Sequence, residues 1–203
     1  RFLKRLIDLV FSGLMLLVAS PIMLIEALCI KLGDGGPVFY KQERLTIDGR
    51  KFYVLKFRTM VVDAEKSGAM LAKKNDDRIT PVGKFLRATR MDELPQFINV
   101  LKGEMSIVGP RPERASIAEE YYKDVPEFRY RLRAKAGLTG LAQIAGKYNT
   151  TPKDKLMLDL MYIEKYSVWM DILLIFQTLK VFFKKDSTEG VDGRIAGTEP
   201  EEE

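Results

Sequence analysis

Residues 9–30, LVFSGLMLLVASPIMLIEALCI, decide the fold of this chain, because Glu26 is their only charged side chain. As a helix rising ~1.5 Å per residue, the segment would be ~33 Å long, about the thickness of a bilayer core. Its apolar residues would fall on all faces of the helix, which is untypical of a helix that packs on one side of a soluble core. The segment is therefore predicted to enter a membrane.

Pro21 predicts a break in this helix, since proline has no N–H to donate and bends the helix around it. Ser20, directly before it, could satisfy a carbonyl that the proline leaves free. Basic residues flank the segment on both sides: Arg1, Lys4 and Arg5, then Lys31, Lys41 and Arg44. Because basic flanks mark the cytoplasmic side, the pattern favours a helix-break-helix that enters one leaflet and returns.

Two other interpretations of the segment remain open. A helix kinked at proline could span the bilayer. A secretory signal peptide would have the same basic start, and residues 18–20 resemble a cleavage site, but a proline directly after them disfavours cleavage.

Composition limits the available chemistry. The chain has 203 residues, 33 basic and 28 acidic, with a net charge of +5. It has no histidine, which excludes a Ser-His-Asp triad and a histidine-rich zinc site. Cys29 is the single cysteine, so an intrachain disulfide is excluded and the cytosolic side is favoured. Carboxylates, Lys, Arg, Tyr and hydroxyl groups remain. The start at Arg1 rather than Met predicts a fragment or processed form.

The rest of the chain predicts a mostly helical α+β domain. Strands are expected at residues 38–40 and 52–57, with a hairpin turn at Asp48-Gly49. Thr80 and Pro81 are expected to begin a helix as its cap and first residue. Further helices are predicted at residues 94–101, 116–122, 125–135, 153–166 and 167–185. The helix that begins at Pro81 has a basic face and the last one carries aromatic residues, a pattern typical of amphipathic helices at a membrane surface.

These patterns divide the chain into three parts. Residues 1–32 are predicted to form the re-entrant membrane helix, residues 33–185 a domain on the cytoplasmic face, and residues 186–203 a disordered tail. Within the domain, residues 61–79 are expected to form a helix and then a loop. Residues 136–148 are expected to form a glycine-rich loop.

Asp92 and Glu93 are adjacent carboxylates beside a basic helix. Carboxylates can attack phosphorus as covalent nucleophiles, and Mg²⁺ prefers oxygen ligands and often bridges substrate phosphates. The alternative interpretation is two solvated surface charges.

Several other residues are candidates for binding phosphate. Arg111 lies between two prolines in SIVGPRP (residues 106–112), a rigid loop that would present a planar guanidinium. Lys56 and Arg58 point the same way from the second strand. Arg87 lies on the basic helix, and Gln143 lies in a glycine-containing loop that could approach a ligand. Each motif alone is also compatible with an ordinary solvated surface.

In this order, the motifs resemble those of the bacterial sugar transferase family, the monotopic polyprenyl-phosphate phosphoglycosyl transferases. The resemblance runs from about residue 4 to about residue 185. It rests on residues 4–8 (KRLID), 20–21 (SP), 36–39 (GPVF), 42–44 (QER), 56–60 (KFRTM), 92–96 (DELPQ), 99–103 (NVLKG), 106–112 (SIVGPRP) and 137–143 (GLTGLAQ). Residues 45–46 depart from it, since relatives often have a glycine there, and this departure concerns the shape of the loop and not the chemistry.

The resemblance implies a fold, an activity and roles for these residues. Ser20 and Pro21 match the break of the family's re-entrant helix. Asp92 matches the position of the nucleophile, and Glu93 matches the acid next to it. Arg111 matches the arginine of the family's Pro-Arg-Pro motif. The implied reaction moves a sugar phosphate from a UDP-sugar to polyprenyl phosphate, with UMP leaving first and a covalent phosphosugar forming on Asp92. Mg²⁺ at Asp92 and Glu93 is expected. The start at Arg1 fits the catalytic part of a longer member.

The implied setting is the bacterial inner membrane, with the catalytic domain on its cytoplasmic face. The expected partners are the UDP-sugar, polyprenyl phosphate, membrane lipids and a second copy of the chain, but not nucleic acid. The step would be the first membrane step of glycan assembly, as for exopolysaccharide, O-antigen or glycoprotein.

Two other functions are compatible with parts of the sequence. A catalytically silent membrane scaffold for glycan assembly would share the membrane segment, but the intact Asp92, Glu93 and Arg111 favour an enzyme. A membrane-tethered nucleic-acid binder would use the basic residues alone and would bind DNA with a steep salt dependence.

Overall fold

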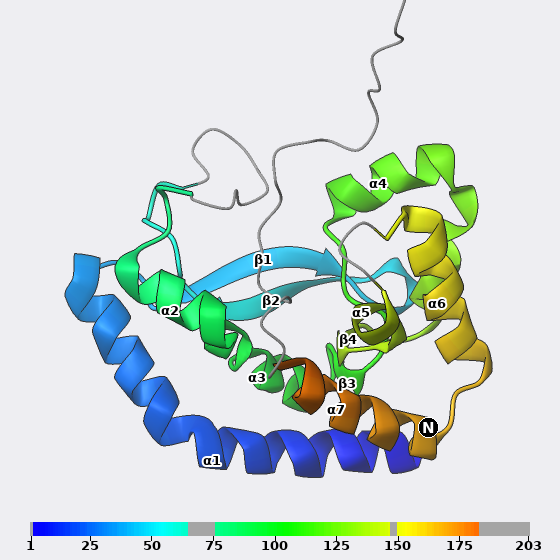
Figure 1. Cartoon of the computed structure of the whole chain (residues 1–203), viewed down its shortest axis with the longest axis horizontal. Coiled ribbons are helices and arrows are strands. Elements are labelled where there is room, and N and C mark those ends of the chain that lie inside the picture. The colour runs from blue at the N-terminus through cyan, green and yellow to red at the C-terminus, as the bar shows by residue number, and fades with distance from the viewer. Residues whose placement is uncertain (1, 65–75, 147–149, 183–203) are drawn as a thin grey trace, which may run out of the picture.

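A helix of 33 residues, α1 (Phe2–Asp34), runs along one side of the molecule, and the other elements lie on one side of it (Figure 1). The structure, a computed structural model, describes residues 2–64, 76–146 and 150–182. The predicted disordered tail, residues 186–203, lies outside the described residues. Of the described helices, α1 alone is long and apolar enough to cross a membrane by length and composition.

The predicted break in α1 is a bend and not an interruption. The helix is continuous through Pro21, and it changes direction about midway along its length (Figure 1). Proline has no N–H for the carbonyl of Leu17, four residues earlier, and Ser20 Oγ donates to that carbonyl instead at 2.8 Å. The expected role of Ser20 is therefore confirmed.

The N-terminal end of α1 is attached to the domain through buried polar contacts. Asp8 Oδ1 accepts hydrogen bonds of 3.0 Å from Ser106 Oγ and from the backbone N–H of Ile107. Arg5 donates to the carbonyls of Val100 (2.6 Å) and Leu101 (2.8 Å). These carbonyls belong to the last turn of a helix, where intrahelical donors run out. The polar side chains of this motif therefore hold α1 against the domain.

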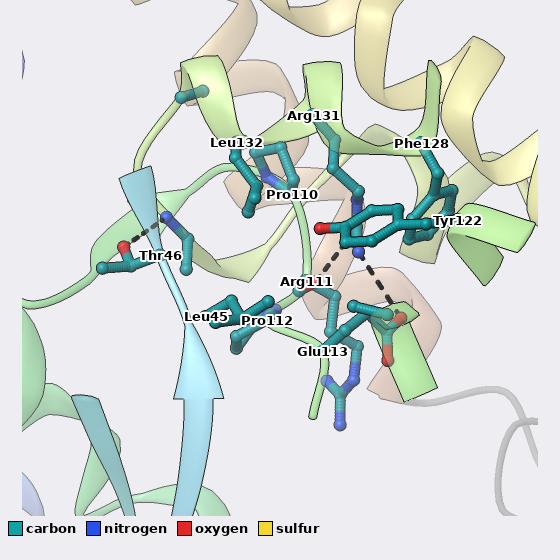
Figure 2. Close-up of a pocket in the computed structure, with 13 residues that line it drawn as sticks. Leu45, Thr46, Pro110, Arg111, Pro112, Glu113, Tyr122, Phe128, Arg131 and Leu132 are labelled. Carbon is teal, nitrogen blue, oxygen red and sulfur yellow. Dashed lines mark hydrogen bonds and ion pairs between the residues drawn. The ribbon is translucent and has the colours of Figure 1, made fainter. Parts of the chain in front are cut away.

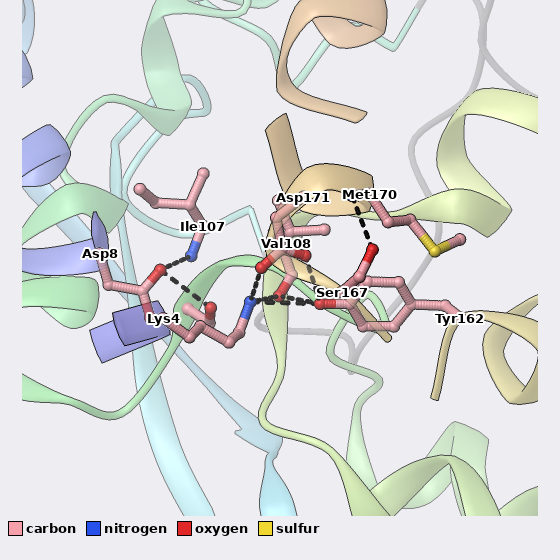
Figure 3. Close-up of polar contacts among 9 residues, drawn as sticks. Lys4, Asp8, Ile107, Val108, Tyr162, Ser167, Met170 and Asp171 are labelled. Carbon is pink, nitrogen blue, oxygen red and sulfur yellow. Dashed lines mark hydrogen bonds and ion pairs between the residues drawn. The ribbon is translucent and has the colours of Figure 1, made fainter. Parts of the chain in front are cut away.

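Lys4 extends the same attachment (Figure 3). Its Nζ donates to the carbonyl of Val108 at 2.9 Å and forms an ion pair of 2.7 Å with Asp171 Oδ2. Tyr162 donates to Asp171 Oδ1 at 2.8 Å, and burial together with the Asp171 carboxylate holds the pKa of Tyr162 above its ordinary value. Lys4 and Arg5, which were interpreted as membrane-flanking charges, thus have partners inside the protein.

The predicted hairpin is present and longer than expected. Strands β1 (Phe39–Leu45) and β2 (Lys51–Phe57) pair in antiparallel register, with Phe39 opposite Phe57 and Leu45 opposite Lys51. The turn contains a short 3-10 helix, η1 (Ile47–Gly49), in which Asp48 and Gly49 have φ angles of 58° and 72°. Asp and Gly tolerate this left-handed conformation best, which confirms the turn signal.

Five predicted helices are confirmed. They are α2 (Pro81–Thr89), α3 (Gln96–Lys102), α4 (Ala115–Asp124), α6 (Pro152–Glu164) and α7 (Val168–Phe182). Thr80 caps α2 as expected, because its hydroxyl accepts from Gly83 N at 2.9 Å. Gly103 ends α3 with a φ of 83°.

Two segments differ from their predictions. Residues 125–135, predicted as an α-helix, form a 3-10 helix, η3 (Pro126–Arg133). Residues 136–148, predicted as a loop, contain strand β4 (Gly137–Thr139) and the short helix α5 (Leu141–Ala145). β4 pairs in parallel with β3 (Ser106–Val108). Gly109 and Gly137 approach so closely that a Cβ on either would overlap the other segment's backbone. The glycines therefore allow the two segments to pack together, rather than giving a loop its flexibility.

Residues 61–79 are described only in part. Within residues 61–64 and 76–79 there is no helix, and Ile79 forms an isolated bridge with Met60. The remainder of that prediction lies outside the described residues.

Two apolar clusters form the core. The larger joins β2, α3, β3, β4, α6 and α7, and its fully buried members include Val100 and Met105. The smaller packs Ile30 of α1 against Phe57 and Leu86. Both ends of α1 therefore contact the same domain.

We predict that Asp8→Ala lowers the free energy of unfolding by on the order of 3 kcal/mol, because two buried donors lose their acceptor. Asp8→Asn keeps an oxygen acceptor in the same place and is the matched control, with a smaller loss. Thermal unfolding in detergent measures both. Equal, small losses for the two variants would contradict the attachment described above.

Candidate active site

A sharp turn after α2 presents the two adjacent carboxylates. Arg90 follows α2 in the left-handed conformation, with a φ of 56°, and a 3-10 helix, η2 (Met91–Glu93), comes next. A non-glycine residue in this conformation costs roughly 1–2 kcal/mol, and such strain is often found at functional sites. The turn ends the helix at Thr89 and directs Asp92 and Glu93 away from its axis.

Glu93 joins two elements that are distant in sequence. Its Oε1 accepts from Lys56 Nζ at 2.6 Å and from Arg111 Nη2 at 3.1 Å. Lys56 comes from β2, and Arg111 comes from the proline-flanked loop after β3. Burial alone would raise the pKa of Glu93, but Arg111 and Lys56 outweigh it and hold the pKa well below its ordinary value. Glu93 is therefore ionised and fixed.

Asp92 differs from Glu93 in the direction of its pKa shift and in its hydrogen bonding. Burial raises its pKa, Glu93 adds to the rise, and Lys56, Arg87 and Arg111 oppose it. Within the described residues, no side chain or backbone N–H donates a hydrogen bond to the Asp92 carboxylate. A partly desolvated carboxylate with open lone pairs beside three cations is suited to react with an electrophile that carries negative charge, such as a phosphoryl group.

The other predicted site residues differ in their distance from this cluster. Arg87 lies within electrostatic range of Asp92, and its Nε donates to Thr59 Oγ1 at 2.8 Å. Arg58 is buried and forms an ion pair with Asp34 at the end of α1. Gln143 lies in α5, where its Nε2 donates to the carbonyl of Leu138 at 3.1 Å. The structure thus brings Lys56, Arg87 and Arg111 to the carboxylates, and gives Arg58 and Gln143 other contacts.

The donor set can be compared with the needs of a metal ion. In the part of the chain that is described, no three Asp, Glu or Cys side chains gather closely enough to hold a metal ion by themselves. Asp92 offers open carboxylate oxygens, which are hard ligands of the type that Mg²⁺ prefers. Mg²⁺ is commonly bound by one or two carboxylates with substrate phosphate oxygens and water, and Asp92 with Glu93 fits that pattern.

Two residues near the cluster are not among the predicted site residues, although Glu26 is the only charge in its apolar segment. Glu26 of α1 is only 5% exposed, and neither carboxylate oxygen has a hydrogen-bond partner within the described residues. It shares a helix face with Met23 and Ile30, which belong to the same apolar cluster as Met91. Arg131 is buried behind the Arg111 loop (Figure 2). It belongs to a run of alternating arginines, FRYRLR, in which spacing does not indicate which one is buried.

Comparison with known proteins identifies relatives of this arrangement. Residues 1–185 match the sequence profile of a family described as bacterial sugar transferase. A UDP-glucose:undecaprenyl-phosphate glucose-1-phosphate transferase of Klebsiella pneumoniae is 44% identical over 190 residues, which are 91% of this chain and 41% of that protein. A UDP-N-acetylgalactosamine-undecaprenyl-phosphate N-acetylgalactosaminephosphotransferase of Aeromonas hydrophila is 40% identical over 88% of this chain and 43% of that protein.

A shorter relative is covered more fully. A UDP-glucose:undecaprenyl-phosphate glucose-1-phosphate transferase of Caulobacter vibrioides is 39% identical over 91% of this chain and 71% of that protein. The chain thus spans about two fifths of the length of the first two relatives. The matched region contains the carboxylates and the cations around them.

We predict that Asp92→Asn raises the melting temperature at neutral pH in magnesium-free buffer. The folded-state pKa of Asp92 lies above its unfolded value, so the ionised carboxylate favours unfolding once the pH exceeds that folded-state pKa. The gain should shrink as the pH falls through the folded-state pKa and should vanish below the ordinary aspartate pKa of about 3.9, where the carboxyl becomes protonated in both states. Glu120→Gln, on an exposed turn of α4, is the control and should change little. A lower melting temperature for Asp92→Asn at neutral pH would contradict the assigned environment.

Proposed function

The chain belongs to the bacterial sugar transferase family, and we propose that it moves a sugar phosphate from a UDP-sugar to polyprenyl phosphate. The observation that carries this proposal is the open, partly buried carboxylate of Asp92 within range of Lys56, Arg87 and Arg111. The relatives named above act on undecaprenyl phosphate and on UDP-glucose or UDP-N-acetylgalactosamine. Because these sugars differ, the proposal is made for the class of UDP-sugars.

In the first step, an Asp92 oxygen attacks the phosphorus that carries the sugar. The bond between that phosphorus and the bridging oxygen breaks, UMP leaves with the bonding electrons, and a phosphosugar remains on Asp92. An ionised aspartate needs no base to act as a nucleophile, so the lack of histidine is no obstacle. The guanidinium of Arg111 and the ammonium of Lys56 stabilise charge on the transferring group.

In the second step, an oxygen of polyprenyl phosphate attacks the same phosphorus. The bond from phosphorus to Asp92 breaks, the carboxylate is regenerated, and a polyprenyl diphosphate sugar is released. Glu93 keeps Lys56 and Arg111 in place in both steps, since it contacts each of them. Bound at Asp92 and Glu93, Mg²⁺ would neutralise phosphate charge.

The proposed site lies at a membrane surface, where a soluble and a lipid substrate can meet. Exposed apolar residues along α1 include Val10, Leu17 and Val18, which are 63%, 72% and 65% exposed. On α7, the exposed apolar residues are Trp169, Leu173, Phe176 and Leu179. Exposed apolar surface of this extent is typical of contact with lipid.

We further propose that α1 enters one leaflet and returns, with the catalytic domain on the cytoplasmic face. Asp8 near one end and Ile30 near the other both contact the same domain, which favours a bent, re-entrant course over a spanning one. The basic residues Lys31, Lys41 and Arg44 favour the cytoplasmic side.

The activity is tested with the membrane-embedded protein, Mg²⁺ and a panel of UDP-sugars, with release of UMP as the measurement. We predict that at least one UDP-sugar releases UMP and that Asp92→Asn lowers the rate by roughly 10³-fold or more, as expected on loss of a covalent nucleophile. Asp124→Asn, at the exposed end of α4, is the matched control and should retain activity. Near-normal turnover of Asp92→Asn would remove Asp92 as the nucleophile.

The course of α1 is tested by labelling single cysteines with a membrane-impermeant maleimide. Cys29 is exposed and is first changed by Cys29→Ser. Phe2→Cys then reports the N-terminal end of α1, Lys41→Cys reports β1, which follows its C-terminal end, and Glu120→Cys reports α4. We predict that all three label only from the cytoplasmic side. Labelling of Phe2→Cys from the side opposite to Glu120→Cys would replace the re-entrant helix by a spanning one.

A further inference from the structure

The loop that presents Arg111 is held by arginine side chains bound to its backbone. Arg131 Nη2 donates to the carbonyl of Arg111 at 2.8 Å. Arg44 Nη1 donates to the next carbonyl, that of Pro112, at 3.0 Å. Proline has no N–H, so the carbonyls carry most of the hydrogen bonding of this loop. The two arginines therefore bind the groups that the loop has available.

Backbone donors bind the carbonyls on either side. Gly137 N donates to the carbonyl of Pro110 at 2.9 Å, and Leu45 N donates to the carbonyl of Glu113 at 3.0 Å. Four successive carbonyls, residues 110–113, thus accept hydrogen bonds from β1, η3 and β4. A loop fixed at every carbonyl has little freedom to change the direction of its side chains.

Arg131 is itself held in one orientation. Its side chain is only 3% exposed, and its Nε donates to Asp159 Oδ2 at 2.8 Å. Its Nη1 lies 3.6 Å from Glu113 Oε1, and its Cζ lies 4.7 Å from the ring centre of Phe128. A buried arginine is tolerated only when its charge and donors are paired, and a planar fork paired on several sides is well oriented.

The partner carboxylate lies on α6, far from the turn that carries Asp92. Asp159 is 1% exposed. Lys155, one turn earlier on the same helix, forms an ion pair with Glu113. Figure 2 shows the Arg131 side chain reaching down to Arg111 and Glu113, with dashed contacts to both. Two residues of α6 therefore contact the loop, one directly and one through Arg131.

We infer that Arg131, oriented by Asp159, is a positioning residue for the Arg111 guanidinium, and this inference rests on the proposed function. Arg131 donates to the backbone of Arg111 and, within the described residues, makes no hydrogen bond or ion pair with Glu93 or Asp92, so any effect on those carboxylates passes through the loop that carries Arg111. The guanidinium of Arg111 lies at hydrogen-bond distance from Glu93, and a displacement of about 1 Å at such a site can cost about 10²-fold in rate.

The test is a double-mutant cycle on UMP release by the full membrane-embedded chain. Arg131→Lys keeps the charge but cannot donate to Asp159 and to the carbonyl of Arg111 with one planar fork. We predict a fall in kcat/KM of roughly 10-fold or more in the native background and little further fall in an Arg111→Ala background. Asp159→Asn should give the same pattern. If Arg111→Ala is too slow to follow, Arg111→Lys takes its place in the cycle.

Melting temperatures show whether a loss of activity simply follows a loss of stability. In a positioning role, the effect of Arg131→Lys on activity depends on Arg111 while its effect on stability does not. Arg131→Lys should lower the melting temperature by the same amount with and without the Arg111 side chain, because the hydrogen bond goes to the backbone. Arg5→Lys is the matched control, since Arg5 also donates to two backbone carbonyls, in α3. Its effect on activity should be the same in both backgrounds.

Two outcomes would overturn the inference, and they are distinguishable. If Arg131→Lys lowers kcat/KM by the same factor in both backgrounds while the unmodified protein is active, Arg131 has only a structural role. If the unmodified protein releases no UMP from any UDP-sugar, the proposed function fails and this inference fails with it.

Discussion

The pairing of Glu93 with two cations is the interaction on which the site depends. A carboxylate that is partly removed from water is stabilised by pairing, and Glu93 has partners 37 and 18 residues away in sequence, Lys56 and Arg111. This pairing brings the hairpin and the proline-flanked loop to the turn after α2. Because Glu93 occupies the donors, its neighbour Asp92 keeps open lone pairs close to the same cations. One residue thus organises the charges and the next remains free to react.

A second constraint is that a long apolar helix has to be attached to a polar domain. Apolar contacts alone would not fix its rotation, because α1 is apolar on most faces. Asp8 and Lys4 provide directional contacts instead, with backbone and side-chain partners in β3, α6 and α7. At the other end, Ile30 packs in the apolar cluster that includes Met91, beside Asp92 in the turn after α2. The helix that we propose to enter the membrane is therefore coupled at both ends to the domain that holds the site.

The net charge of +5 does not describe the charge that a ligand meets, because some of the basic side chains are paired inside the protein. Lys4 and Arg131 are paired inside the protein, so they contribute little to the field outside it. At the candidate site, Lys56, Arg87 and Arg111 lie around two carboxylates, so the cations there exceed the carboxylates by one. Such an arrangement fits a substrate with several negative charges that binds in one orientation.

Much of the local structure of this protein could be predicted from its sequence. The effect of Pro21 and Ser20 on α1, the Asp48-Gly49 turn and the Thr80 cap depend on residues within about four positions of one another, and for these the structure agrees with the sequence except that α1 bends without a break. The sequence patterns also predicted Lys56 and Arg111, the two cations that contact Glu93, as phosphate-binding residues. Only the tertiary structure decided which charge pairs with which: Arg58 with Asp34, Lys4 with Asp171, Arg131 with Asp159. These pairs join segments 24, 167 and 28 residues apart, and the distance between such segments is set by packing, which no local pattern encodes.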